Sequence, residues 1–250
     1  MDMKTLRLLL ERAGANPSIK DTMNGQTPLS WTAQYGQEGV VKLLPERGEV
    51  NPESRDDYGR TPLHHSAEGG SERILLLLLE QGEVNPDSRD NFGQTPLSHV
   101  ARHGSERIVK LLLEREDVNP ESRDIFGQTP LFLAATYGKK ETVKLLLEHN
   151  KVNPESRDND GRTPLSHAAE RGHGGMVKLL LEREDVNPES RDRFGRTPLS
   201  RAAEYGREGV VKLLLELEEV DPQSRDNCDR TPRSYAAEYG REGALKLLPE

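Results

Sequence analysis

The sequence predicts an all-α repeat solenoid, and two observations lead to this fold class. A Thr-Pro dipeptide returns every 34 residues, with its threonine at Thr27, Thr61, Thr95, Thr129, Thr163, Thr197 and Thr231. Only 33% of the 250 residues are hydrophobic and 31% are charged, which leaves little apolar material for one thick core. A thin stack of repeats needs less core per residue, because each unit buries its apolar face against its neighbours.

Other columns keep the same step along the chain. A glycine recurs at Gly36, Gly70, Gly104, Gly138, Gly172, Gly206 and Gly240, and a Ser-Arg-Asp triplet recurs with its arginine at Arg55, Arg89, Arg123, Arg157, Arg191 and Arg225. This register predicts one continuous domain made of a half-repeat at 1–20, full repeats at 21–55, 56–89, 90–123, 124–157, 158–191 and 192–225, and a capping repeat at 226–250. We expect the Arg and Asp columns to form ladders between repeats rather than functional sites.

The first helix of a repeat is predicted from its end signals. In the repeat at 90–123, Thr95 can cap the helix with its hydroxyl, and Pro96 suits the first helical position because it has no amide to satisfy. Gly104 tolerates the left-handed conformation that closes a helix. The signals therefore predict a helix over 96–103.

A second helix is predicted from Glu106 to about Arg115. Its Ile108, Val109, Leu111 and Leu112 follow the spacing of one buried helix face. The segment 117–128 holds Asn-Pro and a glycine, which indicate turns rather than helix. Each repeat is therefore predicted to contain two helices and an extended loop.

These motifs resemble the ankyrin-repeat family over nearly the whole chain. The resemblance includes Thr-Pro-Leu at the start of the first helix, paired small residues such as Ala168-Ala169, the closing glycine, and Val-Lys-Leu-Leu-Leu-Glu in the second helix. It implies helix-turn-helix units joined by extended β-hairpin-like loops. Similar Ser-Arg-Asp variants occur in long ankyrin arrays of filamentous fungi. Tetratricopeptide repeats also have 34 residues, but there proline closes the second helix, whereas here it opens the first.

The fourth position of the motif departs from the family. Ankyrin repeats usually have histidine there, but this chain has it only at His64; Phe132 occupies one repeat, and serine occupies the others, at Ser30, Ser98, Ser166, Ser200 and Ser234. We expect the hydrogen bond that this histidine makes between repeats to be replaced or lost where serine stands.

The two ends of the chain also depart from the repeat. Residues 4–12 match a second helix whose first helix is missing, and Pro45 and Pro249 are expected to shorten their helices. In the last repeat Arg233 replaces the leucine of six others, and Asp229 replaces a glycine. A polar residue suits an outer face, so we interpret 226–250 as a capping repeat, whereas the N-terminal end shows no cap.

The aromatic residues gather in two columns that we expect to face solvent. Winding the first helix at about 100° per residue places Leu97, Val100 and Ala101 on the packed side, and His99, Arg102 and His103 opposite. The helix column holds Trp31, Tyr35, Arg102, His103, Tyr137, Arg171, Arg201, Tyr205, Tyr235 and Tyr239, and the loop-tip column holds Tyr58, Phe92, Phe126 and Phe194.

These two columns are the candidate partner-binding residues. Tyr, Trp and Arg carry much of the binding energy of protein interfaces. The family resemblance implies that loop tips and the exposed side of the first helix line a concave binding groove. The alternative is that the loop-tip rings stack on neighbouring loops and only stiffen the array.

Other classes of partner and compartment are disfavoured. The net charge of −8 argues against a surface for nucleic acid, which needs clustered cations. No apolar run approaches the ~20 residues that cross a membrane. The single cysteine, Cys228, excludes an internal disulfide and a cysteine-based zinc site, and indicates the cytosol or nucleus.

Two constellations suggest chemistry but repeat too regularly to be sites. A zinc site could in principle use His65, His99 and His103, although we expect these to be solvated surface residues. A catalytic triad could use Ser166, His167 and Asp158. Catalysis needs one singular arrangement, whereas these residues belong to repeated columns, and we expect no cofactor and no metal.

We therefore expect a monomeric, non-catalytic module or scaffold that binds a protein partner. The main alternative is head-to-tail self-association through the uncapped N-terminal end, and an unrecognised enzyme is a lesser one.

Overall fold

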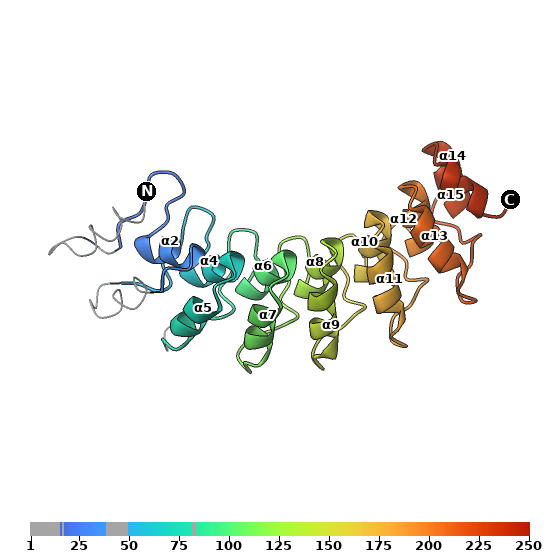
Figure 1. Cartoon of the computed structure of the whole chain (residues 1–250). Coiled ribbons are helices and arrows are strands. Elements are labelled where there is room, and N and C mark those ends of the chain that lie inside the picture. The colour runs from blue at the N-terminus through green and yellow to red at the C-terminus, as the bar shows by residue number, and fades with distance from the viewer. Residues whose placement is uncertain (1–15, 17, 39–49, 82–83) are drawn as a thin grey trace. The chain divides into compact units, whose positions relative to one another are not determined.

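A computed structural model describes residues 16, 18–38, 50–81 and 84–250 of the chain (Figure 1). The chain divides into two compact units, Met1–Ile125 and Phe126–Glu250. The described first helices are α2 (Pro28–Gln34), α4 (Pro62–Gly69) and α6 (Pro96–His103) in unit 1, and α8 (Pro130–Thr136), α10 (Pro164–Arg171), α12 (Pro198–Glu204) and α14 (Pro232–Glu238) in unit 2. The described second helices are α5 (Glu72–Leu79) and α7 (Glu106–Leu113) in unit 1, and α9 (Lys140–Glu148), α11 (Gly174–Leu181), α13 (Glu208–Leu215) and α15 (Glu242–Leu247) in unit 2.

Within each unit the helix pairs stack in sequence order (Figure 1). First helices pack on first helices, as α4 does on α2 and α6, and second helices pack on second helices. No strand is assigned in the described ranges, so the predicted all-α repeat fold is confirmed. The continuity of the two units as one domain stays a prediction.

Each first helix begins at a Thr-Pro dipeptide, because the threonine hydroxyl accepts a main-chain hydrogen bond that the first turn cannot make internally. In α6 the amide of Ser98 donates to Thr95 Oγ1 at 3.3 Å, and Pro96 takes the first helical position. The helix ends at His103, and Gly104 follows with a φ of 90°. Both predicted ends are confirmed.

The second helices bury one face and expose the other. In α7 the side chains of Ile108, Val109 and Leu112 are fully buried, whereas Leu111 is half-buried. The helix ends at Leu113, slightly before the predicted end.

The loops form hairpin-like turns that bond to the next loop. The amide of Asp90 donates to the carbonyl of Gln94 at 2.9 Å, and the amide of Gly93 donates to the carbonyl of Asp90 at 3.0 Å. The amide of Ile125 then donates to the carbonyl of Phe92 at 2.9 Å, so successive tips are held together by their main chains. This geometry agrees with the expected β-hairpin-like loops.

The arginine of the Ser-Arg-Asp triplet crosses from one repeat to the next. Arg55 Nη1 donates to the carbonyl of Gly59 in its own loop at 2.8 Å and to the carbonyl of Arg89 in the next repeat at 2.5 Å. Arg157 makes the equivalent pair of bonds in unit 2, to Gly161 and Arg191. The expected ladder between repeats is therefore present in the arginine column.

His64 makes a hydrogen bond to the next repeat, whereas Ser98 at the equivalent position bonds within its own repeat. The amide of Thr61 donates to His64 Nδ1 at 3.1 Å, and His64 Nε2 donates to the carbonyl of Gln94 in the next repeat at 3.0 Å. Ser98 instead bonds Thr95 within its own repeat, with 3.2 Å between the two hydroxyl oxygens. The bond between repeats is thus present at His64 and replaced by a local one at Ser98, as expected.

Arg233 in the last repeat bonds the chain's final turn. Its Nη1 donates to the carbonyl of Leu245 at 2.9 Å and to the carbonyl of Leu248 at 2.8 Å. These carbonyls belong to the C-terminal end of α15, where main-chain acceptors lack helical partners. A half-buried arginine at this position therefore closes the last repeat, which agrees with a capping role.

Asp229 occupies a backbone conformation that other repeats give to glycine. Its φ is 60°, the only positive value at a non-glycine among the described residues. Replacing Asp229 with Gly is expected to raise the free energy of unfolding by about 0.5–1 kcal/mol. The left-handed conformation costs a non-glycine residue ~1–2 kcal/mol, and the greater unfolded-state entropy of glycine offsets part of the gain. Urea denaturation measures this gain in the free energy of unfolding, provided that the dependence on urea concentration (the m-value) is the same for both chains.

The reverse substitution in the preceding repeat serves as the control for this prediction. Gly195 has a φ of 80°, and a Cβ there would lie 2.5 Å from Asn227 Oδ1. Gly195→Asp should therefore lower the unfolding midpoint. A lower midpoint for Asp229→Gly would contradict the strain that we assign to this position.

Several expectations about the N-terminal end lie outside the described residues. They are the helix at 4–12 with its missing cap, and the shortening of a helix at Pro45.

Candidate binding face

The loop tips carry exposed aromatic rings. Tyr58 is 47% exposed, Phe92 46%, Phe126 53% and Phe194 43%. Each ring precedes a glycine with positive φ, which makes the tight turn that lifts the ring away from the helices. The expected exposure of the loop-tip column is confirmed.

Arginines lie over two of these tip rings. The guanidinium carbon of Arg60 lies 5.0 Å from the ring centroid of Tyr58, and those of Arg193 and Arg196 lie 4.7 and 4.6 Å from that of Phe194. Such cation–π contacts are worth about 0.5–1 kcal/mol at exposed sites, and both rings remain about half exposed. In the described part of the chain the ring of Tyr58 does not stack on that of Phe92, and the tips on either side of Phe194 carry Asp160 and Cys228 instead of rings.

The C-terminal ends of the first helices expose a second set of side chains. Tyr35 is 54% exposed, Tyr137 44%, Tyr205 39% and Tyr239 47%. Arg102, His103 and Arg171, at the same ends of their helices, are exposed as well. We call the loop-tip rings and these helix ends together the binding face.

Two expected members of the helix column are buried, and placing them on a solvent-facing stripe was wrong. Tyr235 is 1% exposed and Arg201 5%. The Tyr235 hydroxyl donates to Asp226 Oδ2 at 2.7 Å, and Arg201 Nη2 donates to Asp192 Oδ2 at 2.9 Å. The preceding loop folds over this side of the helix, which a helical wheel cannot represent.

Trp31 occupies the same position of its repeat as Arg201 and Tyr235, and it is half-buried. Its Nε1 donates to Asp21 Oδ2 at 2.7 Å, and its ring stacks on Tyr35 with 4.9 Å between centroids. Asp21 lies ten residues before Trp31, whereas the aspartates that bond Arg201 and Tyr235 each lie nine residues before their partners. That spacing is a signal in the sequence that could have revealed these buried pairs.

The histidines of the same column are also buried rather than solvated, which corrects a second expectation. His65 is fully buried and its Nε2 lies 3.1 Å from Asp56 Oδ2, while His99 is 8% exposed and its Nε2 lies 2.9 Å from Asp90 Oδ2. Of the candidate zinc ligands only His103 is exposed. No group of three metal-ligating residues occurs among the described residues.

The loop aspartates are strongly held as anions. Burial alone would raise the pKa of Asp56, but hydrogen bonds from His65 and from the amide and side chain of Arg60 lower it to about 2. Burial likewise opposes ionisation of Asp226, and hydrogen bonds from Tyr235 and Arg230 outweigh it and lower the pKa to about 2. These carboxylates anchor the loops beneath the exposed tips.

The candidate triad does not assemble. Ser166 Oγ lies 3.2 Å from Thr163 Oγ1 and so bonds the helix cap rather than a base. His167 Nε2 lies 3.7 Å from Asp158 Oδ2, beyond hydrogen-bond distance. Burial and the positive charges of Arg162 and Arg201 lower the pKa of His167 to about 3. Nothing here activates a serine nucleophile.

A groove in unit 1 brings the two exposed columns together. Its volume is about 430 Å³. Tyr58 and Phe92 line it from the loop tips, and Arg102 and His103 line it from the end of α6. His103 Nε2 lies 3.7 Å from a carboxylate oxygen of Glu68, which lines the same groove. Aromatic, cationic and anionic groups therefore meet in one groove.

Comparisons with known proteins agree with the repeat pattern. A family model described as "Ankyrin repeats (3 copies)" matches residues 2–90, 40–124, 76–154, 101–192 and 184–250. The crystal structure of the ankyrin repeat domain of Bcl-3, described as a unique member of the IkappaB protein family, is 26% identical with a TM-score of 0.74. The match covers 90% of this chain and 98% of that chain. No curated protein matches the sequence at a significant level.

No helix in the described ranges is both long enough and apolar enough to cross a membrane.

Proposed function

Because the chain belongs to the ankyrin-repeat family, we propose that it is a non-catalytic protein-binding module whose partner lies along the binding face. Ankyrin repeats serve generally as protein–protein interaction modules. The single observation that carries the proposal is the unit 1 groove, where exposed rings of two loop tips meet the polar end of α6.

The chemistry of this groove favours a protein segment over a small ion or a nucleic acid. Tyr58 and Phe92 offer large rigid surfaces, which is where binding energy concentrates in interfaces. Arg102, His103 and Glu68 offer both signs of charge at its edge. A partner segment with apolar side chains flanked by polar groups complements this arrangement.

We extend the proposal to the helix ends of unit 2, where Tyr137 and Tyr205 are exposed. We place the module in the cytosol or nucleus, since its one cysteine is exposed and unpaired, which suits a reducing compartment.

Removing the groove's rings is expected to weaken partner capture without unfolding the chain. The variant Tyr58→Ala/Phe92→Ala loses two side chains that are each about half exposed. Truncating such interface anchors typically costs ~2 kcal/mol or more each, which corresponds to at least a tenfold loss of affinity. Quantitative capture from host extract by the immobilised full chain, followed by titration of the recovered partner, measures the effect.

The matched control is Leu76→Ala, which removes an exposed apolar side chain from the second helix α5 instead. It should capture the partner as the unchanged chain does. A second arm uses Tyr137→Ala/Tyr205→Ala, which should keep the far-UV helix signal and the melting temperature while reducing capture. Equal capture by all variants would contradict the proposed face, and a loosened fold would show that the rings are structural.

Light scattering over a range of protein concentrations separates this function from head-to-tail self-association. A constant monomer mass is expected, whereas a mass that grows with concentration supports the alternative.

A further inference from the structure

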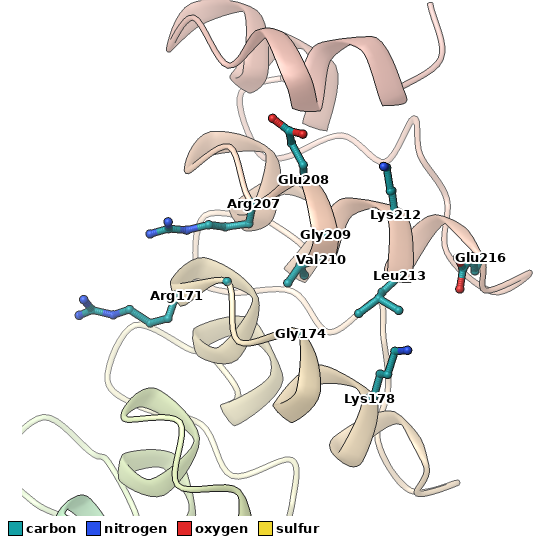
Figure 2. A pocket seen from close by; sticks show the side chains of 11 residues that line it. Arg171, Gly174, Lys178, Arg207, Glu208, Gly209, Val210, Lys212, Leu213 and Glu216 are labelled. Atoms are coloured by element: carbon teal, nitrogen blue, oxygen red, sulfur yellow. The ribbon is translucent and has the colours of Figure 1, made fainter.

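A second groove lies in unit 2 between the second helices α11 and α13, away from the loop tips (Figure 2). Its volume is about 560 Å³. Val210 and Leu213 of α13 form its apolar part, and Gly174 and Gly209 lie at its helix starts. We call it the outer groove. It shares only Arg171 with the binding face, so it goes beyond the function proposed above.

In unit 1 the corresponding space between repeats is occupied by ion pairs. Arg107 Nη1 of α7 lies 3.6 Å from Glu72 Oε2 of α5, and Arg73 Nε of α5 lies 2.7 Å from Glu38 Oε2 of the preceding repeat. In both cases the second residue of one helix meets a carboxylate 35 residues earlier in the chain. We call the space between these two side-chain positions, the first of one second helix and the second of the next, the seat. In these two cases of unit 1 a carboxylate and a cation occupy it.

The next groove in unit 2 shows that a carboxylate also fits the seat when glycine faces it. Between α13 and α15, the position of Arg107 is taken by Gly243, and Glu208 occupies the space where a Cβ of Gly243 would lie. Figure 2 accordingly shows Glu208 directed away from the outer groove, toward the next helix pair. The seat is therefore shaped for a carboxylate even without an arginine opposite.

In the outer groove both positions of the seat are glycine. Gly209 stands where Arg107 stands in α7, and Gly174 stands where Glu72 stands in α5. A Cβ on Gly209 would meet no atom within 4 Å, and the nearest atom to a Cβ on Gly174 would be Leu213 Cδ1 at 3.5 Å. The main-chain conformation requires glycine at neither position, because both lie in helices. The seat is thus open, and none of the residues that the structure describes places a carboxylate there.

Cations line the groove at both ends of this open seat. Figure 2 shows Arg171 and Arg207 extending in the same direction at one end, and Lys178 and Lys212 at the other. Arg207 Nε donates to the carbonyl of Glu170 at 2.9 Å, which fixes its direction. Within the described part of the chain, neither lysine lies within ion-pair distance of a carboxylate, whereas Lys144 in α9 pairs with Glu141 at 3.0 Å.

The charge of this groove contrasts with the rest of the chain. The net charge is −8, but four cations line the outer groove against two carboxylates, Glu208 and Glu216. Figure 2 shows Glu208 pointing away from it. A local positive potential in an acidic protein attracts an anionic group and gives it a defined place to bind.

We propose that the outer groove binds an acidic peptide segment of a partner protein. A Glu or Asp side chain of that segment fills the open seat over Gly174 and Gly209, between the arginine and lysine ends. A neighbouring apolar side chain of the segment packs on Leu213. The partner carboxylate takes the place that Glu72 holds in α5, and the groove's cations take the role of its arginine.

The test uses the full chain and a short fluorescein-labelled peptide built from Glu-Leu-Glu triplets, with fluorescence anisotropy as the readout. The Glu peptide should bind at least about tenfold more tightly than its Gln-Leu-Gln counterpart. The difference should shrink as salt rises toward ~0.5 M, because the groove is open to solvent and its charges are screened. Equal affinity for the two peptides would overturn the proposal.

The most direct variant adds a carboxylate of this chain to the seat. Gly209→Glu adds a carboxylate at the seat, where its Cβ would meet no atom within 4 Å. It should lower the affinity for the Glu peptide at least about tenfold. The matched control is Gly175→Glu, which adds the same charge at the equivalent position of α11, where a Cβ also meets no atom within 4 Å. This control should bind the Glu peptide with an affinity within about twofold of that of the unchanged chain. Equal weakening by both variants would show only a general charge effect and would overturn the proposal.

A second pair of substitutions tests the proposal independently, in case Gly209→Glu fails to fold. Lys178→Glu/Lys212→Glu reverses two exposed charges and should also lower the affinity for the Glu peptide. The control Lys246→Glu in α15 should leave this affinity unchanged. A phosphoserine peptide that binds while the Glu peptide does not would overturn the choice of a carboxylate. Because Tyr58→Ala/Phe92→Ala leaves the outer groove intact, failure of the first binding face would not change these results.

Discussion

Replacing Leu75 with Ala is expected to lower the free energy of unfolding by about 2–5 kcal/mol. Leu75 is fully buried, and its helix α5 packs on its own first helix α4 and on the neighbouring α7. Truncation removes the burial of its methyl groups and leaves a cavity between stacked repeats, which the thin core has few other side chains to fill. Urea denaturation followed by far-UV circular dichroism measures the loss.

The adjacent Leu76 provides the matched control in the same helix. It is 38% exposed, so Leu76→Ala should cost less than about 1 kcal/mol. Equal losses for the two variants would contradict the assignment of a buried and an exposed face to α5. The same reasoning applies to Leu131 and Leu165 in unit 2, which are at most 1% exposed.

Acid is expected to destabilise unit 1 through His64. Burial and the neighbouring charge on His99 lower the pKa of His64 to about 3. The neutral ring fits the site, because Nδ1 accepts the amide of Thr61 while Nε2 donates to the carbonyl of Gln94. A second proton would place two donors face to face at Nδ1.

The sign of the pH effect follows from this lowered pKa. The unfolded chain binds a proton as the pH falls through ~6.5, whereas the folded chain binds none at His64 until pH is near 3. Stability is therefore full above ~6.5 and is lost as the pH falls through this window, by about 2 kcal/mol at pH 5. Unfolding free energies measured between pH 7 and pH 5 give the effect before the loop aspartates protonate.

His64→Ser isolates this contribution, because five other repeats carry serine at the same position. Between pH 7 and pH 5, the free energy of unfolding of this variant should fall by about 2 kcal/mol less than that of the unchanged chain. Ser98→Ala in the next repeat is the control and should leave the pH dependence unchanged. An unaltered dependence in His64→Ser would show that His64 is not the group whose protonation destabilises the fold.

Local signals in the sequence accounted for the helices of each repeat. The Thr95-Pro96 pair and Gly104 fixed both ends of α6, because caps and left-handed turns depend on residues within a few positions of each other. The same holds for the loop tips, where Phe92 and the glycine after it form a tight turn that leaves the ring exposed.

A helical wheel does not represent contacts between a helix and its preceding loop, and only the spacing from the loop aspartate to the helix position marks them in the sequence. Tyr235 and Arg201 belong to the helix face that a wheel places in solvent, yet both are buried against aspartates of that loop. A polar side chain on a helix is read as exposed unless its partner is known, and the partner comes from another element. Trp31 shows the same effect in weaker form.

The outer groove depended still more on tertiary structure. Gly174 and Gly209 are unremarkable in the sequence, because glycine also occurs elsewhere in the second helices. Only the stacking of α11 on α13 brings the two together and leaves a seat that Glu38 and Glu72 fill in unit 1. The four cations around it come from separate segments of two repeats.

The sequence by itself determined the repeat length, the helix ends, the aliphatic core and the exposed loop-tip rings of this protein. Each of these follows from the spacing of residues within one repeat or from the repetition of that spacing. The tertiary structure alone decided which polar side chains are buried under a loop and where the stack leaves an open, cationic seat. The physical reason is that burial and charge pairing depend on neighbours from other segments, whose positions relative to a helix are set only when the repeats pack.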